Sequence, residues 1–225
     1  MAGFLNSSIG KKFLMSVSGL FLIIFVGLHA TLNDLLLVGP RAYNIAAHFM
    51  DTNWMVKIIE PILWIGFLLH IIYAFIVEAY NRVKRPIDYA MTVRRHQSTW
   101  VSRNMIWIGV VIFVFLGVHL SEFFCTIKCG NPPQTVINGV RMNDTYKLVV
   151  SVFQTKWLVD IVYVLGAIAL AMHLHHAFWS AFQTLGWSND KWRKIWNVIG
   201  DIYAVLIGFG FAVPPIYFWV MYNLH

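Results

Sequence analysis

The chain has 225 residues, of which 59% are hydrophobic and only 12% are charged, and its mean hydropathy is +0.65. A soluble protein is usually about 45–50% apolar and about 25% charged. The composition therefore excludes a cytoplasmic enzyme, a nucleic-acid-binding domain and a disordered tail, and it indicates an integral membrane protein. Nine histidines stand beside ten acidic residues. Their positions are informative, because titratable side chains are costly in hydrocarbon.

Five apolar segments are long enough to cross a bilayer, whose hydrocarbon core needs about 20 helical residues. They are Phe13–Val38, Asn53–Arg82, Arg103–Cys125, Trp157–Leu185 and Ile195–Tyr222. We expect one all-α membrane domain over residues 1–225, without room for a separate soluble domain. Pro61 is tolerable as a kink near one end of the second segment, whereas Pro214-Pro215 in the fifth segment predict a kink or a stop.

The longest connection, between the third and fourth segments, contains two turn signals, Gly130-Asn131-Pro132-Pro133 and Asn138-Gly139. The two cysteines, Cys125 and Cys129, lie next to this connection. They could form a disulfide in an oxidising compartment, but they are too few to hold an iron–sulfur cluster.

Lysine and arginine predict the orientation, since they concentrate on the cytoplasmic side. The N-terminus and the loops after the second and fourth segments hold eleven of them, including the basic stretch Arg82–Arg103, and the opposite segments hold six. We therefore expect a multi-pass membrane protein with its N-terminus in the cytoplasm. The basic stretch is either a docking face for an acidic partner or an ordinary solvated loop.

Four histidines lie 16 or 17 residues into their segments: His29 after Lys12, His70 after Asn53, His119 after Arg103 and His173 after Trp157. At 1.5 Å per residue, each is about 25 Å from its point of entry. Because successive helices run in opposite directions, His29 and His119 share an outer layer and His70 and His173 an inner one. His48, His96 and His225 lie in loops or at the end of the chain.

Two histidines at one depth on different helices are what bis-imidazole ligation of a haem requires. Two such layers predict two haems, with the first four helices forming the haem-binding bundle. Each histidine alone has other interpretations: an interhelical hydrogen bond, a proton relay or a substrate contact. His176 lies on the same side of its helix as His173, so either of them could face the haem, whereas His175 points away.

Four short segments resemble the di-haem cytochrome b anchor, of the single five-helix type, of succinate:quinone oxidoreductases and quinol:fumarate reductases. They are Gly27-Leu28-His29-Ala30-Thr31-Leu32-Asn33, Leu69-His70-Ile71-Ile72-Tyr73, Gly117-Val118-His119-Leu120 and Met172-His173-Leu174 through Phe178-Trp179-Ser180. The resemblance selects His173 over His176. Some relatives carry a Glu two residues before the fourth ligand, where this chain has Ala171.

The resemblance implies an electron-transfer subunit with two haem b groups, held by His29 with His119 and by His70 with His173. Its partners would be a flavoprotein subunit, which carries the succinate/fumarate active site, and an iron–sulfur subunit, both cytoplasmic. Its substrate would be a quinone, with menaquinone favoured, and a dimer of the complex stays open. A quinone site needs a carboxylate or histidine at a membrane edge. The candidates are His48, Asp51 and Glu122, and Glu60 is a less favoured fourth candidate.

Two alternatives remain from the residues alone. One is the cytochrome b of another respiratory oxidoreductase, of the hydrogenase or formate dehydrogenase type, or a free-standing cytochrome b. The other is a proton-coupled transporter whose buried histidines form a relay. Transporters usually show repeated halves and interrupted helices, and the sequence shows neither clearly.

Overall fold

The computed structural model describes residues 7–84, 100–187 and 189–224. Within them, five helices are long and apolar enough to cross a membrane: Ser8–Val38, Trp54–Val83, Met105–Cys129, Trp157–Thr184 and Asp190–Asn223. The predicted helical, multi-pass membrane architecture is confirmed. The first and fifth helices begin earlier than predicted, and the third ends later.

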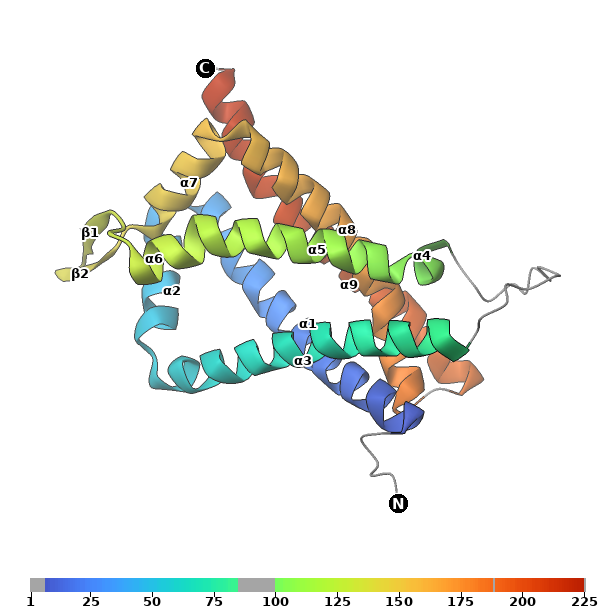
Figure 1. The fold of residues 1–225 in the computed structure, drawn as a ribbon. Coiled ribbons are helices and arrows are strands. Elements are labelled where there is room, and N and C mark those ends of the chain that lie inside the picture. The colour runs from blue at the N-terminus through green and yellow to red at the C-terminus, as the bar shows by residue number, and fades with distance from the viewer. Residues whose placement is uncertain (1–6, 85–99, 188, 225) are drawn as a thin grey trace.

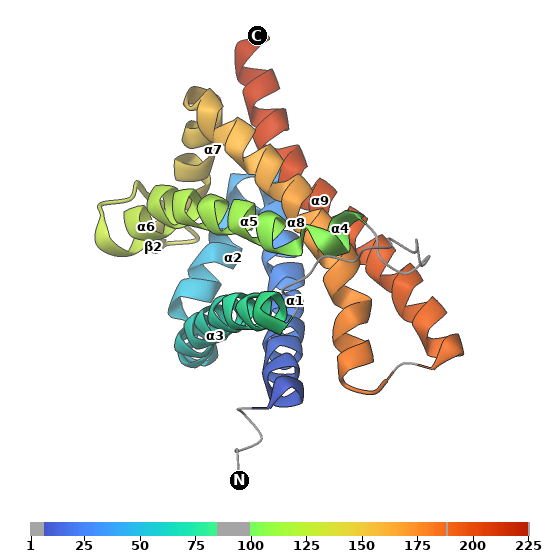
Figure 2. The ribbon, with the colours of Figure 1, turned by 45° about the vertical axis from the view of Figure 1, so that its right-hand side comes forward.

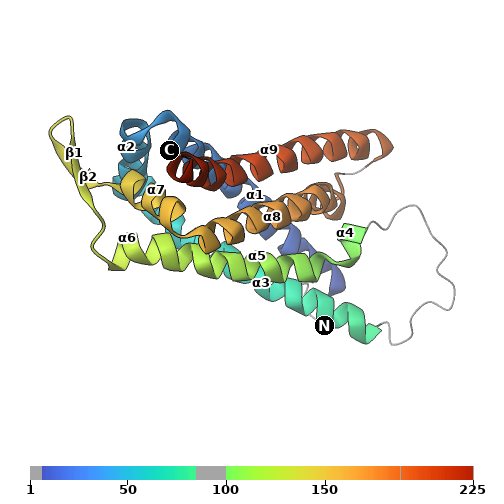
Figure 3. The same cartoon turned by 90° about the horizontal axis from the view of Figure 1, so that it is seen from above.

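The long helices run back and forth between two ends of the molecule (Figures 1 and 3). They are α1 (Ser8–Val38), α3 (Trp54–Lys84), α5 (Met105–His119), α8 (Trp157–Thr184) and α9 (Asp190–Asn223). One end, here called the N end, holds the start of α1, the short helix α4 (Trp100–Arg103) and the turn between α8 and α9. The other, the C end, holds the connecting helices and the end of α9.

The C end carries three small elements that the sequence did not predict as such: α2 (Pro40–Thr52), α7 (Thr145–Thr155) and a hairpin of β1 (Gln134–Ile137) and β2 (Val140–Asn143). The turn predicted at Asn138-Gly139 is confirmed. Both residues have positive φ, 54° and 78°, as the tight turn of a two-residue hairpin requires.

A buried amide joins α2 to the start of α7. The Asn44 side chain, only 2% exposed, donates to Asp144 Oδ1 at 2.8 Å, and its oxygen accepts from the backbone N–H of Tyr146 at 2.8 Å. Asp144 also caps α7 by accepting from the N–H of Lys147. These bonds tie the two connecting helices together over the C end of the bundle.

The third membrane helix changes its winding directly after His119. Helix α5 ends there, Leu120–Phe124 form a π-helical segment, η2, and α6 (Cys125–Cys129) continues beyond it. A π turn holds one residue more than an α turn and is found frequently at functional sites. The interruption lies next to one of the candidate ligands.

Pro214 and Pro215 do not stop the fifth helix, so the stop expected as one alternative is wrong. Helix α9 continues through both prolines to Asn223, and both are buried. Each proline removes one backbone hydrogen bond, a loss that membrane helices tolerate when neighbouring helices pack around the site.

Helices α8 and α9 lie side by side along most of their length (Figure 2) and form the most extensive helix pair. Next to them, Ala30, Leu174, Ala204 and Ile207 form a buried cluster, and the Tyr203 hydroxyl donates to the carbonyl of Ile23 in α1 at 2.5 Å. Helix α9 has no histidine, in agreement with a packing role. Large apolar side chains of α3 face outward, as they can in a lipid environment.

Candidate functional site

The structure brings the four intramembrane histidines together as two pairs, each formed across helices. His29 of α1 and His119 of α5 lie near the C end, with ring centroids 5.6 Å apart and ring planes at 82°. His70 of α3 and His173 of α8 form the second pair, at 6.2 Å and 75°. These are the pairs expected from the spacing of the histidines along the chain.

Residues of α1 contact His70 of the His70–His173 pair. The hydroxyl of Ser18 donates to the carbonyl of Leu14 at 2.8 Å, so its oxygen can accept from His70 Nδ1, 3.4 Å away. The backbone of α1 approaches the ring closely at Gly19, where a Cβ would lie in van der Waals contact, 3.4 Å from His70 Cε1. With Nδ1 occupied, Nε2 is the nitrogen of His70 that is left to bind a metal.

The Nδ1 atom of His173 is buried and has no hydrogen-bond partner among the described residues. A buried polar nitrogen without a partner is uncommon in a native interior. Its neighbours on α8 have other contacts: His176 packs edge-on against Trp179 at 5.7 Å, and His175 pairs with Asp201 at 2.6 Å. Of the three clustered histidines, His173 is therefore the one that faces His70.

The His29–His119 pair lies among aromatic rings. Phe25 stacks on His29 with centroids 5.3 Å apart, and Phe115 stacks on His119 at 5.9 Å. The Tyr163 hydroxyl is 2.9 Å from His119 Nδ1 and can accept a hydrogen bond from it. As with Ser18 and His70, this contact leaves Nε2 free and fixes the orientation of the ring.

Both pairs have the spacing that a hexacoordinate haem iron needs. An imidazole–metal bond is about 2 Å long and the ring centroid lies about 1 Å further, so axial imidazoles have centroids about 6 Å apart. The observed 5.6 and 6.2 Å agree with this value. Among the described residues, no group of three or more His, Cys, Asp or Glu could hold a metal ion.

The candidate quinone-site carboxylates all lie toward the C end, and each has a cation beside it. Asp51 and Glu60 share Lys128, at 2.8 and 3.7 Å, and Glu122 of η2 pairs with Lys156 at 2.6 Å. His48 lies on α2, where its carbonyl accepts from Thr52. The structure brings Asp51 and Glu60 together, whereas Glu122 belongs to a separate ion pair.

Some sequence expectations concern other parts of the chain. Cys125 and Cys129 are free thiols, both exposed on the short helix α6, so the disulfide considered above is not formed. His96, His225 and most of the basic stretch, residues 85–99, lie outside the described residues.

The sequence reasoning missed three polar residues within the spans. Tyr163 contacts His119, Asp201 pairs with His175, and Asp160 is 6% exposed with neither carboxylate oxygen hydrogen-bonded among the described residues. An ionisable residue in a membrane helix is itself a signal of function, and it would have identified both aspartates.

No protein-family model, curated protein or solved structure matches the chain. The family resemblance stays a prediction from the sequence motifs.

Proposed function

We propose that the chain is the di-haem cytochrome b anchor of a succinate dehydrogenase or fumarate reductase complex. The observation that carries the proposal is the presence of two cross-helix imidazole pairs, at 5.6 and 6.2 Å, toward the two ends of one bundle. A single buried histidine has many uses, whereas two pairs at the separation of axial ligands favour two haems.

The chain's own part in the mechanism is to hold and orient the ligands. Ser18 and Tyr163 contact Nδ1 of His70 and His119, which would leave Nε2 of each ring to hold haem iron. All four imidazoles are partly buried in the bundle. Haem iron, when bound, supplies one-electron transfer; two such centres would let electrons cross between the faces of the membrane.

The remaining parts of the proposal follow from the family resemblance. The N end would face the cytoplasm and carry the flavoprotein and iron–sulfur subunits, and the quinone, favoured as menaquinone, would exchange electrons with the haems. The membrane would be a bacterial cytoplasmic membrane. The excess of lysine and arginine in the N-end segments supports this orientation.

A haem count on matched histidine variants tests the proposal. The purified chain should contain two b-type haems by pyridine haemochrome assay, and His173→Ala should lose one of them. His176→Ala is the control, because it removes an imidazole one turn further along α8 that packs against Trp179 rather than against a histidine. It should keep both haems. Folded protein without a Soret band would overturn the proposal.

Co-purification then identifies the complex. A flavoprotein subunit that oxidises succinate should accompany the anchor through a mild detergent purification. A hydrogenase or formate dehydrogenase subunit in its place would keep the haem assignment and redirect the chain to another respiratory oxidoreductase.

A further inference from the structure

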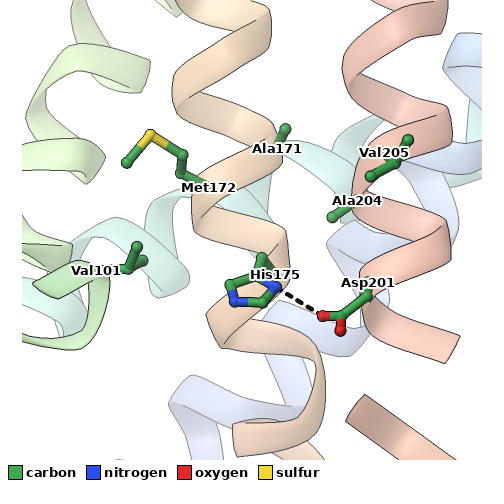
Figure 4. Close-up of a pocket in the computed structure, with 7 residues that line it drawn as sticks. All are labelled: Val101, Ala171, Met172, His175, Asp201, Ala204 and Val205. Atoms are coloured by element: carbon green, nitrogen blue, oxygen red, sulfur yellow. Dashed lines mark ion pairs between the residues drawn. The ribbon is translucent and has the colours of Figure 1, made fainter. Parts of the chain in front are cut away.

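A groove between α4, α8 and α9 combines apolar walls with one polar pair. It has a volume of about 230 Å³ (Figure 4). Its apolar lining comes from Val101, Ala171, Met172, Ala204 and Val205. His175 of α8 and Asp201 of α9 form the polar part, with Nδ1 and Oδ1 2.6 Å apart. None of these residues belongs to the two histidine pairs.

The His175–Asp201 pair lies well inside its helices. His175 is nine residues before the end of α8 at Thr184, and Asp201 is eleven residues after the start of α9 at Asp190. At 1.5 Å per residue these separations are about 14 and about 17 Å. The two side chains are about half exposed, at 50% and 53%, so they face the surroundings of the bundle. An ionisable pair at this depth is costly and is therefore expected to have a function.

The pair presents one free nitrogen to the groove. Because Nδ1 of His175 faces Asp201, its proton is held there, and Nε2 is the nitrogen that can bond a ligand. In Figure 4, Nε2 points away from Asp201 and toward the side of the groove where Val101 lies. On a neutral ring this nitrogen accepts a hydrogen bond from a hydroxyl group.

These features fit an apolar ring with a hydroxyl group that arrives from the lipid phase. Drug-sized sites usually measure about 300–1,000 Å³, so this smaller groove suits a ring head group whose tail stays outside. We propose that the groove binds the head group of a hydroquinone, with Nε2 of His175 accepting its hydroxyl hydrogen bond. The choice of a hydroquinone rests on the proposed function; the site itself rests on the side chains of this chain.

The site would lie on the N-end side of the bundle, across α8 from the His70–His173 pair. His173 and His175 project from nearly opposite sides of one helix, whose diameter with side chains is about 10–12 Å. The carboxylates first considered for a quinone, Asp51 and Glu122, are at the other end and already pair with lysines. The groove therefore adds a quinone position that the sequence did not indicate.

The chain contains a matched control groove. Phe75, Trp107 and their neighbours on α3 and α5 line a space of about 290 Å³ that also contains an ion pair, Glu78–Arg82 at 2.6 Å. This pair joins residues four apart on one helix, close to the helix end at Lys84. Such a pair is an ordinary feature of an exposed helix surface.

Photolabelling of the whole chain in lipid nanodiscs tests the site. The probe is a diazirine-substituted 2-methyl-1,4-naphthohydroquinone, kept reduced with dithionite, and the labelled residues are mapped by peptide mass spectrometry. Label should appear on α8 near His175 and on α9 near Asp201. His175→Leu, which removes the hydrogen-bond acceptor, and Val205→Trp, which fills the groove from an exposed position, should each weaken labelling about tenfold or more. Glu78→Gln should leave labelling unchanged.

Three results would each overturn the groove assignment. They are label that maps to the C end, label on α8 and α9 that persists in both variants, and the absence of any label. A haemochrome assay on the same samples separates this result from the proposed function. Samples with two haems and label elsewhere contradict the groove alone. Samples without haem but with variant-sensitive label on α8 and α9 contradict the di-haem proposal and support the groove.

Discussion

Replacing Gly166 by alanine should force α5 and α8 apart next to the His29–His119 pair. A Cβ at position 166 would lie 2.6 Å from Cγ and Cδ2 of Phe115, and 3.2 Å from its Cβ. Ordinary contacts between carbon atoms are about 3.5–4.0 Å. A rotation of Phe115 about its Cα–Cβ bond would move Cγ and Cδ2, but it would leave Cβ at 3.2 Å and take the ring off His119, so we expect one of the helices to shift by about 1 Å instead.

The expected destabilisation is about 1–3 kcal/mol, the usual range for an extra methyl group in a packed interior. At about 1.4 kcal/mol for each factor of ten, this corresponds to a change of roughly 5- to 150-fold in the folding equilibrium. Phe115 also stacks on His119 and packs edge-on against Tyr163, so the displacement reaches the ligand pair. The absorption bands of the haem proposed at the His29–His119 pair should change, while those of the haem proposed at the other pair stay as they are.

Unfolding in mixed micelles with increasing dodecyl sulfate measures the destabilisation, and low-temperature absorption spectra measure the effect on the haem bands. Gly109→Ala is the matched control, since it adds the same methyl group to α5 at a position with no atom within 4 Å. It should be neutral or stabilising by up to about 1 kcal/mol, because alanine favours helix more than glycine does. Equal unfolding curves for the two variants would refute the packing argument.

Two further substitutions test the hydrogen bonds of Asn44 and Tyr163 described above. Asn44→Ala should lower the free energy of unfolding by about 1–3 kcal/mol, because it leaves the N–H of Tyr146 without its acceptor and Asp144 without its donor; the same micelle titration checks this, and an unchanged midpoint would contradict it. Tyr163→Phe should cost about 1 kcal/mol of stability and weaken the proposed haem binding at His119 by roughly 10- to 100-fold. Haem titration of the apoprotein measures the loss of affinity. An unchanged affinity would show that the 2.9 Å contact between Tyr163 and His119 does not support haem binding.

Composition and residue spacing predicted much of the architecture. A run of about 20 apolar residues can satisfy its backbone hydrogen bonds only as a helix in lipid, so the five spans were readable from local sequence alone. The two histidine pairs could be predicted because an α-helix advances by a fixed rise per residue. The depth of a histidine in the membrane therefore follows from the number of residues between it and the point of entry.

Other features depend on contacts between segments far apart in the chain. Helix α2 is stabilised at Asn44 by groups about 100 residues later, and no pattern within α2 contains this information. The His175–Asp201 pair likewise required knowing which face of α8 meets α9. The alternative of a stop at Pro214-Pro215 was wrong because the local rule ignores the packing that surrounds two buried prolines.

Because of the π turn after His119, the side chains of the third membrane helix follow one rotational register before the turn and another after it. Residues before it keep the register that directs His119 toward His29, and residues after it are offset by the extra residue. A wheel drawn from His119 with 100° per residue therefore misplaces the side chains of α6, including Lys128, which reaches Asp51 of α2. The direction of His119 and that of Lys128, which pairs with Asp51, are therefore not related by the ordinary rotation of an α-helix.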